Sequence, residues 1–114
     1  MLVTILRWIV ILGTLATGII SLFKPRSVLG FIGFEGIGGR GITEVRAIFG
    51  GLFIGLAIAP VLLDAPAAYE MLGIGYLAIG IARLPAMFLD RSVVSSNWIS
   101  VVVEFVFGLI LLLA

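Results

Sequence analysis

The chain contains no histidine and no cysteine in its 114 residues. Without cysteine it can form neither a disulfide nor a thiolate nucleophile. Without histidine it lacks the usual proton shuttle, the commonest metal ligand and the usual axial ligand of haem. We therefore predict a protein that is not an enzyme, with no catalytic residue, no metal and no cofactor. A membrane enzyme with Glu104 as its base is the less favoured alternative, because no Ser or Tyr supports that residue at a fixed spacing.

Charged side chains are also scarce, at 11% of the chain, whereas 62% of the residues are hydrophobic. A soluble domain has about 25% charged and about 45–50% apolar residues. A short chain has a large surface for its volume, so this one could not cover its outside with polar groups in water. The composition therefore predicts a membrane protein. The net charge of +1 and the lack of a basic patch interleaved with aromatics argue against a nucleic-acid partner.

Four apolar stretches have the length of roughly 20 residues that a helix needs to cross a bilayer. They span residues 2–23, 43–63, 68–89 and 98–114. Pro25, Pro66 and the pair Asp90-Arg91 follow the first three stretches and mark their ends. The second and third connections are short, which places neighbouring helices antiparallel. We predict an all-α integral membrane four-helix bundle with up-down-up-down topology, formed as a single domain by residues 1–114.

Basic side chains are concentrated in or beside the first and third connections: Lys24, Arg26, Arg40, Arg46 and Arg91. Lys and Arg near a membrane favour its cytoplasmic side. This predicts a multi-pass inner-membrane protein with those connections in the cytoplasm and both termini outside. Membrane lipids are the expected partners. The sequence also allows a homo-oligomer or a role as accessory subunit of a larger membrane complex. Arg7 lies toward the opposite surface, where Asp64, Glu70 or lipid headgroups are its predicted partners.

The first connection contains the stretch GIGGRG, in which Gly36, Gly38 and Gly41 match the dinucleotide-binding spacing G-x-G-x-x-G. That motif requires a strand before it and a soluble helix after it. Here membrane-spanning stretches lie on both sides, so we interpret the match as accidental. We predict instead a glycine-rich interfacial or partly re-entrant loop, with Thr43 as the N-cap of the second spanning helix.

Several ionisable residues lie within the predicted spans or at their edge, although each such group costs about 2.5–3.5 kcal/mol on insertion, and four of them are expected to lie toward one side of the membrane. These four are Glu44, Arg46, Arg83 and Glu104. Arg83 precedes Asp90 by seven residues and Glu104 follows Trp98 by six, so both lie about 10 Å deep from the same side. The four residues are predicted to form one cluster. It is either a structural clamp, which their balanced charge favours, or a site for a proton, an anion or a polar headgroup.

Small residues at four-residue spacing predict faces for close helix packing. Gly51, Gly55 and Ala59 form one such face. Gly80 and Gly108 lie on the same helix faces as Arg83 and Glu104. Packing within the bundle is the favoured interpretation, with a homo-oligomer interface as the alternative.

Several of these residues resemble the signature of a family of small bacterial four-helix membrane proteins of unknown function. The matching elements are E-x-R-A-x-F-G-G from Glu44 to Gly51, the stretch G-I-A-R-L from Gly80 to Leu84, and Glu104. The layout more distantly resembles DoxX-like four-helix membrane proteins. The resemblance implies a four-helix bundle with Glu44, Arg46, Arg83 and Glu104 as its signature positions, and it implies no known activity.

For function, the sequence favours a non-catalytic bundle that stabilises a membrane complex or binds a lipid-like ligand. The alternative is a small proton-coupled transporter that uses Glu104 and Arg83. The helix count resembles that of the small multidrug exporters, but those carry their essential glutamate in the first helix, where this chain has Arg7.

Overall fold

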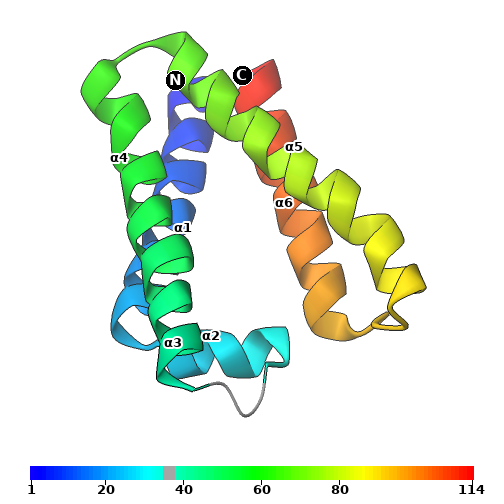
Figure 1. The fold of residues 1–114 in the computed structure, drawn as a ribbon. Helices are drawn as coiled ribbons and strands as arrows, with labels where there is room; N and C mark the ends of the chain where they lie inside the picture. Colours follow the sequence, from blue (N-terminus) through cyan, green and yellow to red (C-terminus); the bar gives the residue numbers. More distant parts are fainter. Residues whose placement is uncertain (35–37) are drawn as a thin grey trace. The chain divides into compact units, whose positions relative to one another are not determined.

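The computed structural model describes residues 1–34 and 38–114, and these residues contain helices and no strand. The elements are α1 (Leu2–Phe23), α2 (Pro25–Ile32), α3 (Gly39–Glu44), η1 (Val45–Leu52), α4 (Phe53–Leu63), α5 (Pro66–Leu89) and α6 (Ser95–Leu113), as seen in Figure 1. The predicted all-α class is confirmed.

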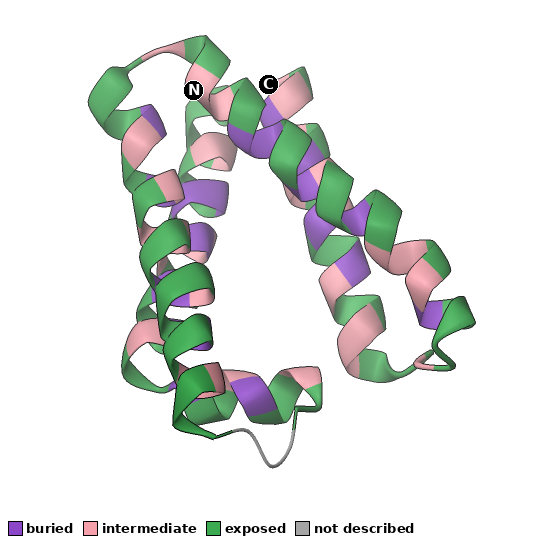
Figure 2. Ribbon diagram, in the orientation of Figure 1, coloured by how far each residue is buried: buried purple, intermediate pink, exposed green. Residues whose placement is uncertain are grey.

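Within residues 1–34 and 38–114, four continuous helical segments are long and apolar enough to cross a membrane: α1, the segment Gly39–Leu63 that joins α3, η1 and α4, then α5 and α6. Much of their apolar surface is exposed, as the predominance of green in Figure 2 shows. Exposed apolar helices of this length are what a lipid environment requires. The chain is therefore a multi-pass membrane protein.

The chain divides into two compact units. One, which we call the α5–α6 unit, comprises Met1–Val10 and Ala65–Ala114, and the other, the 11–64 unit, comprises Ile11–Asp64. In the α5–α6 unit the two long helices run antiparallel, since Gly73 lies against Leu111 and Phe88 against Trp98. In the 11–64 unit α1 and the η1–α4 segment also run antiparallel, since Gly18 faces Ile54 and Leu22 faces Gly50.

The first connection differs from the predicted irregular loop, because part of it is helical. Pro25 occupies the first turn of α2, where its fixed φ suits a helix and its missing N–H is not needed. α2 ends at Gly33, whose φ of 82° is in the left-handed region that glycine adopts without strain. Glu35, Gly36 and Ile37 lie outside the described residues. Gly36 is the first glycine of the G-x-G-x-x-G match, so the structure does not describe that match in full.

The second spanning segment begins at Gly39 instead of the predicted residue 43. Its N-cap is Gly38, so the prediction of Thr43 as the N-cap is wrong. Thr43 lies inside α3, and its hydroxyl donates a hydrogen bond to the carbonyl of Gly39, 3.1 Å away. A threonine hydroxyl that bonds one turn back in this way is an alternative to capping.

η1 is a π-helix of eight residues inside this span. π-helices close hydrogen bonds from residue i to i+5, are rare, and occur mostly as single turns that are frequently at functional sites. The wider turn changes which side chains share a face, so spacing rules for an α-helix do not hold across Val45–Leu52.

Candidate functional site

The α5–α6 unit is held by close contacts at glycines. A Cβ at Gly73 would lie 2.9 Å from the Cβ of Leu111 and 3.0 Å from the carbonyl oxygen of Gly108. A Cβ at Gly80 would lie 3.0 Å from the ring of Phe105. Such approaches are possible only where a side chain is missing, and they are typical of helix contacts in membranes. The structure thus places Gly80 and Gly108, as predicted from their spacing, in the helix interface.

Arg83 of α5 and Glu104 of α6 meet across this interface. The Arg83 Nε–H donates to both carboxylate oxygens of Glu104, at 2.9 Å to Oε1 and 3.1 Å to Oε2. The Glu104 side chain is only 10% exposed, whereas that of Arg83 is 31% exposed. A buried carboxylate is tolerated when a cation and hydrogen bonds satisfy it, which this pair provides.

Asn97 completes the arrangement. Its side-chain oxygen accepts a hydrogen bond from Arg83 Nη1 at 3.1 Å, and its amide nitrogen donates to the carbonyl of Ser92 at 2.8 Å. The guanidinium is thereby fixed on two sides, and the connection between α5 and α6 is tied to the ion pair. Sequence reasoning missed Asn97, although a signal existed: it precedes Glu104 by seven residues, a spacing that puts both on one helix face.

Glu44 and Arg46 belong to the 11–64 unit and have partners there. Arg40 Nη1 donates to the Glu44 carboxylate, an exposed pair one helical turn apart. Arg46 Nη1 donates to the carbonyl of Leu22 in the last turn of α1, a carbonyl that its own helix leaves free. Arg83 and Glu104 lie in the other unit, so the single four-residue cluster stays a prediction.

Glycine contacts in the 11–64 unit involve residues other than those predicted. A Cβ at Gly18 would lie 2.8 Å from the backbone nitrogen of Ile54, and one at Gly50 would lie 3.0 Å from the backbone of Leu22. Gly51 and Gly55 are exposed, and a Cβ at either meets no described atom within 4 Å. In this unit α1 therefore meets the second span at Gly50, and the predicted packing residues Gly51 and Gly55 make no such contact with it.

Arg7, near the start of α1, has two partners in the α5–α6 unit. Its guanidinium lies over the ring of Tyr69, 4.8 Å from the centroid, and Nη2 is 3.4 Å from the main-chain oxygen of Ala114. Its Nε is buried without a hydrogen-bond partner among the described residues. An aromatic face attracts a cation through its quadrupole, so Arg7 contacts Tyr69, whereas Asp64, Glu70 or lipid headgroups were its predicted partners.

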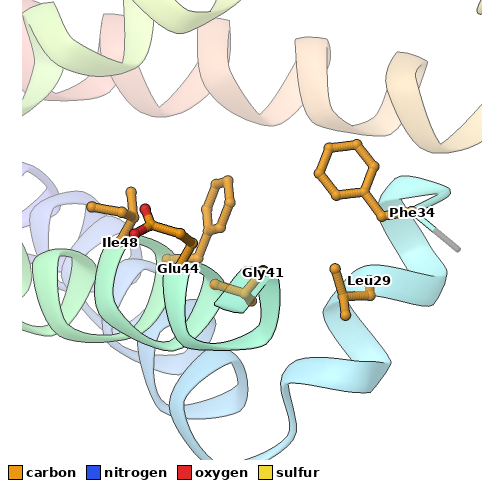
Figure 3. Close-up of a pocket in the computed structure, with 7 residues that line it drawn as sticks. Leu29, Phe34, Gly41, Glu44 and Ile48 are labelled. Carbon is orange, nitrogen blue, oxygen red and sulfur yellow. The ribbon is translucent and has the colours of Figure 1, made fainter. Parts of the chain in front are cut away.

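A pocket of about 230 Å³ lies in the 11–64 unit, between the end of α2 and the start of the second span. Figure 3 shows Leu29 and Phe34 on one side of it, and Gly41, Glu44 and Ile48 on the other. Val45 and Phe49 complete the lining, so the walls are almost entirely apolar. Spacing rules did not reveal this pocket, because the prediction treated residues 24–42 as irregular.

Within the described residues there is no group of three or more acidic side chains placed to hold a metal ion. Comparison with protein-family models, curated proteins and solved structures gives no match. The fold and the charge pair define an α-helical multi-pass membrane protein with a paired intramembrane charge. The resemblance to the small four-helix family and to DoxX-like proteins stays a hypothesis drawn from the sequence.

Proposed function

We propose that this protein is a non-catalytic inner-membrane protein that acts by binding, either to a lipid-like molecule or to a protein partner in a membrane complex. The observation that carries the proposal is the pairing of Glu104. Arg83 occupies both of its carboxylate oxygens, and Asn97 holds Arg83 in place. Arg83 and Glu104 neutralise each other, and a balanced pair of this kind favours a structural role in holding α5 to α6.

The same pairing counts against proton-coupled transport. A transport carboxylate must be free to exchange its partner in each cycle, whereas both carboxylate oxygens of Glu104 already accept hydrogen bonds from Arg83. The positive-inside bias supports the proposed orientation, with the first and third connections in the cytoplasm.

Purification into a mild detergent or a lipid-preserving polymer disc tests the binding role. We expect the protein to emerge with phospholipid or a second polypeptide, detected by native mass spectrometry of the intact complex. A control is the same measurement after exchange into a harsh detergent, which should strip the partner. A monodisperse protein that carries neither lipid nor protein from the mild preparation would contradict the proposal.

Proton flux in proteoliposomes separates binding from transport. Under an imposed pH gradient we expect wild-type vesicles and Glu104→Gln vesicles to leak protons at the rate of protein-free vesicles, because the proposed role requires no proton movement. An internal pH dye measures the rate. Flux that the wild type supports and Glu104→Gln abolishes, with the variant still folded by circular dichroism, would favour the transporter instead.

A further inference from the structure

The pocket beside η1 has the character of a site for hydrocarbon. Among the described residues that line it, Glu44 is the only charged one, and its carboxylate already accepts a hydrogen bond from Arg40. The remaining walls come from aliphatic and aromatic side chains and one glycine. A polar group entering the pocket would therefore lose its hydration without gaining a partner, whereas methylene groups would gain from burial.

The pocket is large enough to hold only part of a lipid-sized molecule. At about 230 Å³ it exceeds the roughly 150 Å³ cavity that accommodates benzene in an apolar protein interior. It is smaller than the roughly 300–1,000 Å³ of pockets that enclose a drug-sized ligand. A short length of hydrocarbon chain fits this range, and the rest of the ligand must remain outside.

The charges around the pocket indicate what remains outside. The sequence from residue 24 to residue 46 lies between or at the edges of two spans and contains four basic and two acidic side chains. Lys24 and Arg26, at the start of α2, are exposed and form no ion pair with any described residue. Basic groups at a membrane surface attract anionic lipids.

We propose that this pocket binds the upper part of one acyl chain of an anionic phospholipid, whose phosphate contacts the exposed Lys24 and Arg26 at the start of α2. The assignment rests on the proposed binding function and makes it specific. α2 follows α1 directly and precedes the second span, so it lies where lipid headgroups meet acyl chains. The first methylenes of a chain and its phosphate are adjacent at that depth.

Two tryptophan substitutions form a matched test. Ile48 and Leu52 are both in η1, are exposed to a similar degree at 46% and 49%, and differ in that only Ile48 lines the pocket. Ile48→Trp should fill the pocket and weaken apparent affinity for phosphatidylglycerol about tenfold, roughly the effect of excluding two methylenes. Leu52→Trp should leave it unchanged. Native mass spectrometry during titration with the lipid measures both.

A charge variant tests the headgroup. Arg26→Gln should reduce the preference for phosphatidylglycerol over phosphatidylcholine of the same chain length, while the wild type keeps that preference. Equal lipid binding by Ile48→Trp and Leu52→Trp would overturn the assignment of this pocket and leave the general binding function standing. A wild type that binds both lipids equally would overturn the anionic headgroup. A wild type that retains neither lipid nor protein would overturn the proposed function itself.

Discussion

Glu104→Ala is expected to lower the free energy of unfolding by about 3 kcal/mol, because it leaves the Arg83 guanidinium in the α5–α6 interface without its counter-charge. Breaking a buried pair by removing one partner costs about 3–5 kcal/mol. We take the lower end because the Arg83 side chain retains 31% exposure and its long stem allows partial relocation. Equilibrium unfolding in mixed detergent micelles, followed by far-UV circular dichroism, measures the change.

Two comparisons separate the ion pair from a general effect of substitution. Glu70→Ala removes an exposed acidic side chain of α5 that has no ion pair among the described residues, so it should change stability by less than about 0.5 kcal/mol. The double variant Arg83→Leu/Glu104→Leu should recover most of the loss, because apolar residues can replace a buried pair at little cost. If Glu104→Ala is as mild as Glu70→Ala, the pair is not a clamp.

Gly108→Val should separate α5 from α6. A Cβ at this position would lie 2.6 Å from the Cγ of Leu77 and 3.0 Å from the carbonyl oxygen of Gly73. Leu77 can change rotamer, but the Gly73 carbonyl belongs to the backbone of α5, so relief requires that the helices move apart. Overpacking of this kind costs typically 1–3 kcal/mol, and contact with backbone places Gly108→Val at the upper end, about 3 kcal/mol.

Gly75→Val is the control for Gly108→Val, since Gly75 is in α5 and a Cβ there meets nothing within 4 Å among the described residues. It should be neutral or slightly stabilising, because valine is a better helix former than glycine. A pair of cysteines introduced on the facing sides of α5 and α6 would report the separation by loss of cross-linking. Equal cross-linking and equal stability for the two valine variants would contradict the glycine contact.

Length and hydropathy were sufficient to predict the four spans, since a bilayer imposes both on any crossing helix. Counting residues from the third connection also placed Arg83 and Glu104 at similar depth, and the structure joins them. That inference succeeded because two regular α-helices joined by a short connection have a fixed rise per residue. Depth alone did not reveal Asn97, whose role depends on rotation about the helix axis.

The contact between the second span and α1 at Gly50 was not predicted, because Gly50 lies in the π-helix. The prediction assumed an α-helix from residue 43, in which Gly51, Gly55 and Ala59 share a face. In the structure Gly50 meets Leu22 of α1 and Gly51 is exposed, and both glycines lie in the π-helix Val45–Leu52. Residue composition gives no reliable sign of a π-helix, so the change from an α-helix to a π-helix could not be derived from the sequence.

The ion pair between Arg83 and Glu104 has a consequence for how the chain enters the membrane. Arg83 is made 21 residues before Glu104, so α5 is complete while its guanidinium still has no counter-charge. An arginine inserted alone costs about 2.5–3.5 kcal/mol, which the later carboxylate offsets only if both helices are present. The energetics thus favour joint entry of α5 and α6 into the bilayer during biogenesis.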